Sequence, residues 1–109
     1  MTYESLKKPS EFSKVYKRGK SFADKNLVIY MLPNKLDYTR VGLSVSKKVG
    51  NSVRRNRVKR LIRETFRLNY HENFGYDIIF IARVRANTAD FAAIEKSMKF
   101  LLNKMNSKA

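Results

Sequence analysis

A continuous apolar run and an alternation of apolar and small or polar residues predict two strands in the first half of the chain. Residues 27–32 form an apolar run that ends at Pro33-Asn34, which is typical of a strand followed by a turn. Residues 40–46 alternate with a period of two. Their apolar face consists of Val41, Leu43 and Val45, and their other face of Gly42, Ser44 and Ser46. We expect the apolar face to lie on the core, while the small residues would let a bound chain approach the sheet closely.

Apolar residues at helical spacing predict three helices. The first is expected to begin with Ser10 as its capping residue and to end at Gly19. The second is expected to begin at Asn51 or Ser52 and to run to about Tyr70. The third is expected to begin at Asn87 or Thr88, ahead of an apolar stripe that consists of Phe91, Ile94, Met98, Leu101 and Leu102.

Two further strands complete the pattern: a short edge strand over residues 20–23 and a buried strand over residues 78–82, which follows a turn at residues 73–75. The expected order is therefore helix, three strands, helix, strand, helix. A length of 109 residues, 43% of them hydrophobic, fits a single domain spanning residues 1–109 with one core. The chain has no Cys, which excludes disulfides, thiolate nucleophiles and Cys-based zinc sites.

The chain shows no signal for a membrane. Its apolar runs are far shorter than the roughly 20 residues that a membrane span needs. Its first residues lack the basic-then-apolar order of a signal peptide. We therefore expect a soluble cytoplasmic protein with no membrane partner.

Charge points to a polyanionic partner. The 24 Lys and Arg against 9 Asp and Glu give a net charge of +15, and such an excess makes the compact state repel itself. Residues 47–67 alone hold nine basic side chains and one acid, Glu64. On a helical wheel, residues 58, 61, 62, 65 and 66 share an arc of about 140° that can dock on a sheet. The opposite arc is almost entirely cationic, with residues 56, 57, 59, 60, 63 and 67.

A charged helix face is often no more than a solvated surface, but this one has an unusual pattern. Arg55–Lys59, Lys59–Arg63 and Arg63–Arg67 are like-charge pairs four residues apart, and each opposes the helix by a few tenths of a kcal/mol. A solvated face usually mixes signs, so the pattern favours a nucleic-acid-binding helix. The loop over residues 46–52 could add a phosphate site at the free N–H groups of the helix start, although its Gly50 could equally serve a simple turn.

Residues 44–64 read Ser-Val-Ser-Lys-Lys-Val-Gly-Asn-Ser-Val-Arg-Arg-Asn-Arg-Val-Lys-Arg-Leu-Ile-Arg-Glu. This stretch, with Arg55-Asn56-Arg57 at its centre, resembles the protein component of bacterial ribonuclease P. The resemblance extends to residues 12–19, 27–31 and 77–83. It implies a two-layer α/β (α+β) sandwich, in which a mixed four-stranded sheet packs with three helices around a left-handed βαβ crossover.

The same resemblance implies a function. The family's enzyme is a ribonucleoprotein endonuclease that removes the 5′ leader from precursor tRNA. Its RNA subunit holds the catalytic Mg²⁺ ions, and its protein binds that RNA and the leader and raises the affinity for substrate and magnesium. The implied partners are thus ribonuclease P RNA and precursor tRNA, with no small-molecule substrate. Which residues of the chain bind a metal stays open: hydrated magnesium could bind where RNA phosphates approach the protein, but the sequence shows no dedicated set of oxygen ligands.

The resemblance implies two binding surfaces, each made of particular residues of this chain. The RNA-binding segment comprises Lys47, Lys48, Asn51, Arg54, Arg55, Asn56, Arg57, Lys59, Arg60, Arg63 and Arg67. The leader cleft comprises Phe12, Tyr16, Tyr30 and Ser44, with Arg55, Asn56 and Lys59 as its basic wall. Aromatic rings beside a basic track suit single-stranded RNA, since stacking contributes about 1–3 kcal/mol per base without demanding a sequence. Tyr30 is out of phase with Leu27, Ile29 and Met31, which lets it leave the core face, although core packing is the default for any single aromatic residue.

The sequence offers little for autonomous catalysis. His71 is its one imidazole, and a position near a helix end explains it better than a role as a general base. Two other functions stay open: a noncatalytic ribosomal or RNA-chaperone module, and a basic helix lying on an anionic membrane. The first needs no leader cleft, and the second needs an apolar helix face that the sheet does not cover.

Overall fold

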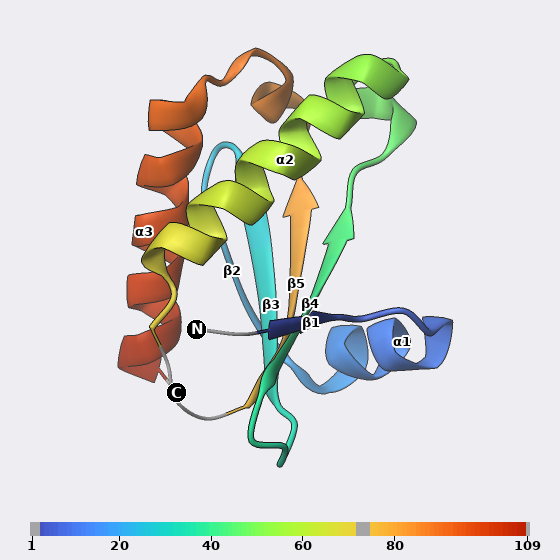
Figure 1. Ribbon diagram of the computed structural model, residues 1–109, viewed down its shortest axis with the longest axis vertical. Helices are drawn as coiled ribbons and strands as arrows, with labels where there is room; N and C mark the ends of the chain where they lie inside the picture. The colour runs from blue at the N-terminus through green and yellow to red at the C-terminus, as the bar shows by residue number, and fades with distance from the viewer. Residues whose placement is uncertain (1–2, 72–74, 109) are drawn as a thin grey trace.

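The computed structural model describes residues 3–71 and 75–108, so most of the turn expected at residues 73–75 lies outside the described residues. Within them the chain forms a five-stranded sheet and three α-helices (Figure 1). The elements are β1 Tyr3–Ser5, α1 Pro9–Arg18, β2 Lys20–Ala23, β3 Leu27–Pro33, β4 Thr39–Ser44, α2 Ser52–Asn69, β5 Tyr76–Ala82 and α3 Phe91–Lys108. Two short 3₁₀ turns, η1 Lys47–Val49 and η2 Val84–Thr88, precede α2 and α3.

The sheet is mixed, as expected, and its strand order is β1-β4-β5-β3-β2. The pairs β1–β4 and β4–β5 are parallel, and β3 pairs antiparallel with β5 and β2. Helix α2 connects the parallel strands β4 and β5. In Figure 1 the chain runs up β4, crosses the near face of the sheet in α2 and re-enters to the left in β5, which is the expected left-handed crossover.

The expected number of four strands is wrong by one, because β1 was missed. This strand has three residues and pairs with the start of β4, where Glu4 lies opposite Arg40. Three residues are too few to show an alternating pattern, and β1 forms only because β4 offers it an open edge.

Helices cover both faces of the sheet. One face packs against α2 and α3 in the main core, which contains Leu27, Ile29, Met31, Val58, Ile62, Phe66, Ile78, Phe80, Ile94, Met98 and Leu101. The other face packs against α1 in a smaller cluster, where Leu6, Val15 and Ile79 are buried. Strand β5 is central and covered on both sides, which explains its unbroken apolar run.

Two of the expected helix starts are wrong and one is confirmed. Ser10 lies inside the first turn of α1, which begins at Pro9. Asn87 and Thr88 belong to η2, and α3 begins after Asp90, whose carboxylate accepts a hydrogen bond from the Ala93 N–H at 2.9 Å. Ala86, fully buried, holds η2 against the core and so delays the start of α3. For α2 the expected cap is correct, because Asn51 Oδ1 accepts from the Arg54 N–H at 3.0 Å.

Replacing Asp90 by Ala is predicted to lower the free energy of unfolding by about 1 kcal/mol, because one N–H group at the start of α3 loses its acceptor. Urea unfolding followed by circular dichroism measures this change. Thr88→Ala is the matched control, since Thr88 makes only a long hydrogen bond of 3.4 Å to the Arg85 carbonyl. An equal or larger loss for Thr88→Ala would show that α3 is capped from η2 instead.

Candidate nucleic-acid interface

Helix α2 divides into a buried and a cationic face, as its sequence predicts. Val58 and Ile62 are fully buried and Phe66 is 1% exposed. Arg54, Arg60, Arg63 and Arg67 are exposed on the other side, and Arg55, Arg57 and Lys59 are half-buried. The buried face anchors the helix on the sheet, so the cations are held in fixed positions relative to one another.

Three arginines of this helix hydrogen-bond to neutral groups of the protein. Arg54 donates to Asn87 Oδ1 at 2.9 Å, Arg55 to the Gly50 carbonyl at 3.2 Å, and Arg57 to the Ala89 carbonyl at 2.8 Å. These acceptors orient the guanidinium groups without cancelling their charge. Arg67 differs, because Glu64 forms an ion pair with it at 2.5 Å. Of the predicted RNA-binding arginines, Arg67 therefore carries a charge that the protein itself offsets.

The loop before α2 places Lys47 and Lys48 at the surface beside the helix start. Val49, only 1% exposed, anchors the loop in the core. Gly50 has a φ of 155°, which residues with a side chain rarely adopt, and a Cβ there would lie 3.1 Å from the Arg54 side chain. Gly50 is therefore needed for the turn that brings the two lysines to the start of α2.

The four residues predicted to line the leader cleft come together from three elements. Tyr16 on α1 and Tyr30 on β3 pack edge to face, with ring centroids 5.1 Å apart. Phe12 lies one helical turn before Tyr16, at 6.5 Å between ring centroids. Burial raises the pKa of Tyr16, and a hydrogen bond with Ser44 of β4 lowers it by a smaller amount. Tyr16 is 39% exposed and Phe12 and Tyr30 are half-buried, so these rings are accessible at the surface.

Gly42 explains how α1 lies so close to the sheet. A Cβ at this position would lie 2.6 Å from Cζ of Phe12, closer than real contacts allow. The small face predicted for residues 40–46 therefore receives an aromatic ring of the protein itself at Gly42. Ser44, two residues further on, lies beside Tyr16 and remains half-buried.

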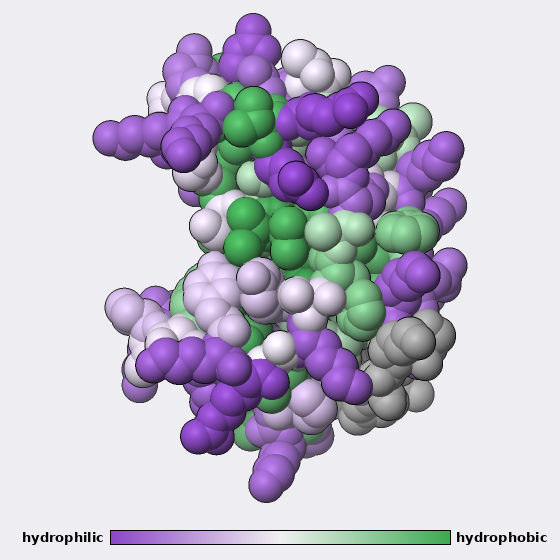
Figure 2. Space-filling view, turned by 180° about the vertical axis from the view of Figure 1, so that it is seen from behind, coloured by the Kyte–Doolittle hydropathy of each residue, from purple (hydrophilic) through white to green (hydrophobic). Residues whose placement is uncertain are grey.

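A cavity of about 160 Å³ joins the aromatic and the basic surfaces. It is lined by Ser5, Leu6, Phe12, Val41, Gly42, Leu43, Lys59 and Arg63. On the side turned away from the viewer in Figure 1, the surface is also hollowed between the N-terminal end of α2 and α1, with hydrophobic atoms between them (Figure 2). Of the residues predicted for the leader cleft, Phe12 and Lys59 line this cavity, whereas Tyr16, Tyr30, Ser44, Arg55 and Asn56 do not.

The sequence predicts Arg63 for the RNA-binding segment only, and it does not predict Ser5 and Leu6 at the cavity. Arg63 follows Lys59 by one helical turn, and this spacing was a signal that both side chains lie on the same side of α2. Ser5 and Leu6 gave no comparable signal, because β1 and the residue after it reach the cavity only through pairing with β4.

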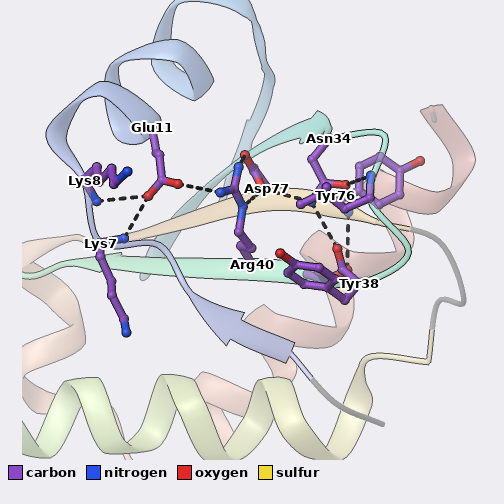
Figure 3. A network of polar contacts seen from close by, with 10 residues as sticks. Lys7, Lys8, Glu11, Asn34, Tyr38, Arg40, Tyr76 and Asp77 are labelled. Carbon is purple, nitrogen blue, oxygen red and sulfur yellow. Dashed lines mark hydrogen bonds and ion pairs between the residues drawn. The ribbon is translucent and has the colours of Figure 1, made fainter.

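A polar network ties the start of α1 to the sheet (Figure 3). Arg40 donates two hydrogen bonds to Asp77, from Nε at 2.8 Å and from Nη2 at 2.7 Å, and its Nη1 donates to Glu11. Asn34 donates a further bond to Asp77 at 2.9 Å. Glu11 Oε1 accepts from the backbone N–H groups of Lys7 and Lys8 at 3.1 and 3.0 Å. These amides, followed by the Arg40 charge, lower the pKa of Glu11, and the bond to Asp77 raises the pKa of Arg40.

The carboxylates near the cavity do not suit a magnesium ion. Glu11 and Asp77 both bind Arg40, so their oxygens face a cation already. In the described part of the chain, no three His, Asp or Glu residues lie close enough together to hold a metal. None of the described helices is long and apolar enough to cross a membrane.

These features define a class of protein: a small, basic α+β domain in which a cationic helix shares a cavity with an aromatic ring of the first helix. A family model described as Ribonuclease P matches residues 1–106. The chain therefore belongs to the ribonuclease P family, as a protein component of that enzyme.

Relatives and solved structures agree with this assignment. The chain is 60% identical over 103 residues to the ribonuclease P protein component of Clostridioides difficile strain 630, covering 93% of this chain and 90% of the relative. It is 50% identical over 106 residues to that of Clostridium botulinum strain Langeland, covering 95% and 96%. Its fold matches the RNase P protein of Staphylococcus aureus with a TM-score of 0.87 and 39% identity, covering 95% and 96% of the two chains. The Thermotoga maritima RNase P protein matches with a TM-score of 0.81 and 32% identity, covering 93% and 96%.

Because the folded state lowers the pKa of Glu11, the ionised carboxylate stabilises the protein at neutral pH. This contribution is present above the ordinary value of 4.5 and is lost as the pH falls through the lowered value. We therefore predict that the difference in free energy of unfolding between the wild type and Glu11→Gln shrinks as the pH falls from about 7 to about 3. Urea unfolding across this range measures it, and a difference that stays constant would contradict the role of the Glu11 charge.

Proposed function

We propose that this chain acts in the cytoplasm as the protein subunit of a ribonucleoprotein that removes the 5′ leader from precursor tRNA. It binds ribonuclease P RNA and the single-stranded leader at once, and so raises the affinity for substrate and for magnesium. The observation that carries this proposal is the cavity that Phe12 of α1 shares with Lys59 and Arg63 of α2, because it brings an aromatic ring and two cations together from two separate helices.

The chemistry of the two surfaces supports binding of a single strand. Phe12, Tyr16 and Tyr30 offer rings on which bases of any identity can stack, and the basic side chains beside them can follow the phosphates. Leaders of different precursors differ in sequence, so this tolerant form of binding suits them. The cations of η1 and of the start of α2 then bind structured RNA, which proteins recognise through its phosphates and its shape.

Among the described residues, the protein's own side chains form no cluster that could act as a catalytic metal site. His71, just beyond α2, is exposed, and the acids of the network in Figure 3 are held by Arg40. In the proposal the RNA subunit therefore supplies catalysis, and Mg²⁺ binds mainly to RNA phosphates. The part of the protein is to orient the substrate and to offset phosphate repulsion where the two RNAs meet.

The proposal predicts a gain in affinity that depends on the leader. With ribonuclease P RNA present, the protein should bind precursor tRNA more tightly than mature tRNA, and at low magnesium it should accelerate 5′ cleavage that the protein alone does not perform. Filter binding and single-turnover cleavage measure the two effects. Equal affinity for both tRNAs, without faster cleavage, would favour a noncatalytic RNA-binding module instead.

A second prediction concerns Arg60 and Arg63, which are exposed on the cationic face. Replacing both by Ala should weaken binding to ribonuclease P RNA and reduce the slope of log K against log salt by about two units or less, since each lost phosphate contact removes up to one. Titrations at several KCl concentrations give this slope. Arg67→Ala is the control, because Glu64 already offsets its charge. If the double variant keeps the wild-type slope, these arginines do not contact phosphate.

A further inference from the structure

We propose that Glu11 is a positioning residue for leader binding: by joining the start of α1 to Arg40, it holds the rings of Phe12 and Tyr16 over β4. This inference rests on the proposed function. It means that an acidic residue favours the binding of a polyanion, because it positions the rings that bind it. The residues that carry it lie outside both surfaces predicted from the sequence.

The network has a rigid base in the core. Asp77 lies on the central strand β5 and is 4% exposed. Its two oxygens bind Nε and Nη2 of Arg40, and Asn34 adds a third hydrogen bond. The guanidinium plane of Arg40 is thereby fixed, so its remaining group Nη1 points to one place. That place is occupied by Glu11.

Glu11 is the link between this base and α1. One of its oxygens accepts the two N–H groups of Lys7 and Lys8, at the entry to the helix, and the other accepts from Arg40. Both oxygens are needed for this arrangement. An amide in place of the carboxylate has one acceptor, so it can keep the helix entry or Arg40 but not both.

The link lies next to the residue that it positions. Arg40 and Gly42 are two residues apart on β4 and therefore lie on the same face, where they receive the neighbouring residues Glu11 and Phe12. Gly42 has no side chain that could hold the Phe12 ring in place. Without the polar contact at Arg40, the first turn of α1 can move across this flat part of the strand, and the Phe12 and Tyr16 rings move with it.

The charge of Glu11 and its positioning role predict opposite effects of the Glu11→Gln substitution on RNA binding. Glu11→Gln raises the net charge of the protein by one, which by itself strengthens binding to any RNA. If Glu11 positions the rings, the same change weakens the leader-dependent part of binding. Arg40 is unsuited to this test, because its removal would leave Asp77 as a buried carboxylate without its cation.

The experiment compares wild type, Glu11→Gln and Asp37→Asn, each assembled with ribonuclease P RNA. Asp37 is exposed in the loop between β3 and β4, and its substitution makes the same change in charge. The measured quantity is the ratio of affinities for precursor tRNA with its leader and for mature tRNA. We expect Glu11→Gln to reduce this ratio about threefold to tenfold, as a partial loss of base stacking would, while affinity for mature tRNA is unchanged or higher. Asp37→Asn should keep the wild-type ratio.

A second measurement separates positioning from general stability. Glu11→Gln is also made in a Phe12→Ala/Tyr16→Ala background, in which there are no rings for it to position, and thermal unfolding shows that each variant is folded at the temperature of the assay. In that background Glu11→Gln should have no further effect on the ratio. Two results would overturn the inference. One is a wild-type ratio in the Glu11→Gln variant, and the other is an equally large decrease of the ratio when Glu11→Gln is made in the Phe12→Ala/Tyr16→Ala background. A wild-type protein without any leader-dependent gain would instead refute the proposed function.

Discussion

The structure depends on burying one face of α2 while like charges crowd the other. Each like-charge pair along the helix opposes it by a few tenths of a kcal/mol, whereas each buried Val, Ile or Phe side chain contributes about 1.5–3 kcal/mol. Val58, Ile62 and Phe66 are almost completely buried, so burial outweighs repulsion by a wide margin. The core therefore holds the cations of α2 in place, and their charge stays available to a polyanion except at Arg67, which Glu64 offsets.

Strand β4 connects this helix to the aromatic surface. Successive residues on one of its faces receive Glu11 at Arg40, Phe12 at Gly42 and Tyr16 at Ser44. The cavity beside it is also lined by Lys59 and Arg63 of α2. One strand thus fixes the distance between rings and cations, and a loss of α1 contact would change that distance without touching any cation of α2.

Much of the fold could be predicted from residue periodicity, because a long helix or strand repeats its pattern of apolar and polar residues several times. The alternation in β4, the apolar run of β5 and the two faces of α2 all appear where residue periodicity places them. The failures concern short or local features. Ser10, Asn87 and Thr88 were as good capping residues as Asp90, and the choice between such candidates depends on which residue the core holds in place. The strand β1 depends on a partner strand about 35 residues away in sequence.

By itself the sequence determined that α2 is cationic on one face, that β4 carries small residues on one face and that Tyr30 is out of phase with Leu27, Ile29 and Met31, since each property belongs to a single periodic element. Tertiary structure decided which of these residues meet. It brought Arg63 of α2 into a cavity with Phe12 of α1, and it made Arg40 of β4 a base for Glu11 of α1. These outcomes depend on distances between elements that pack from opposite sides of a sheet, and no local spacing of residues encodes such distances.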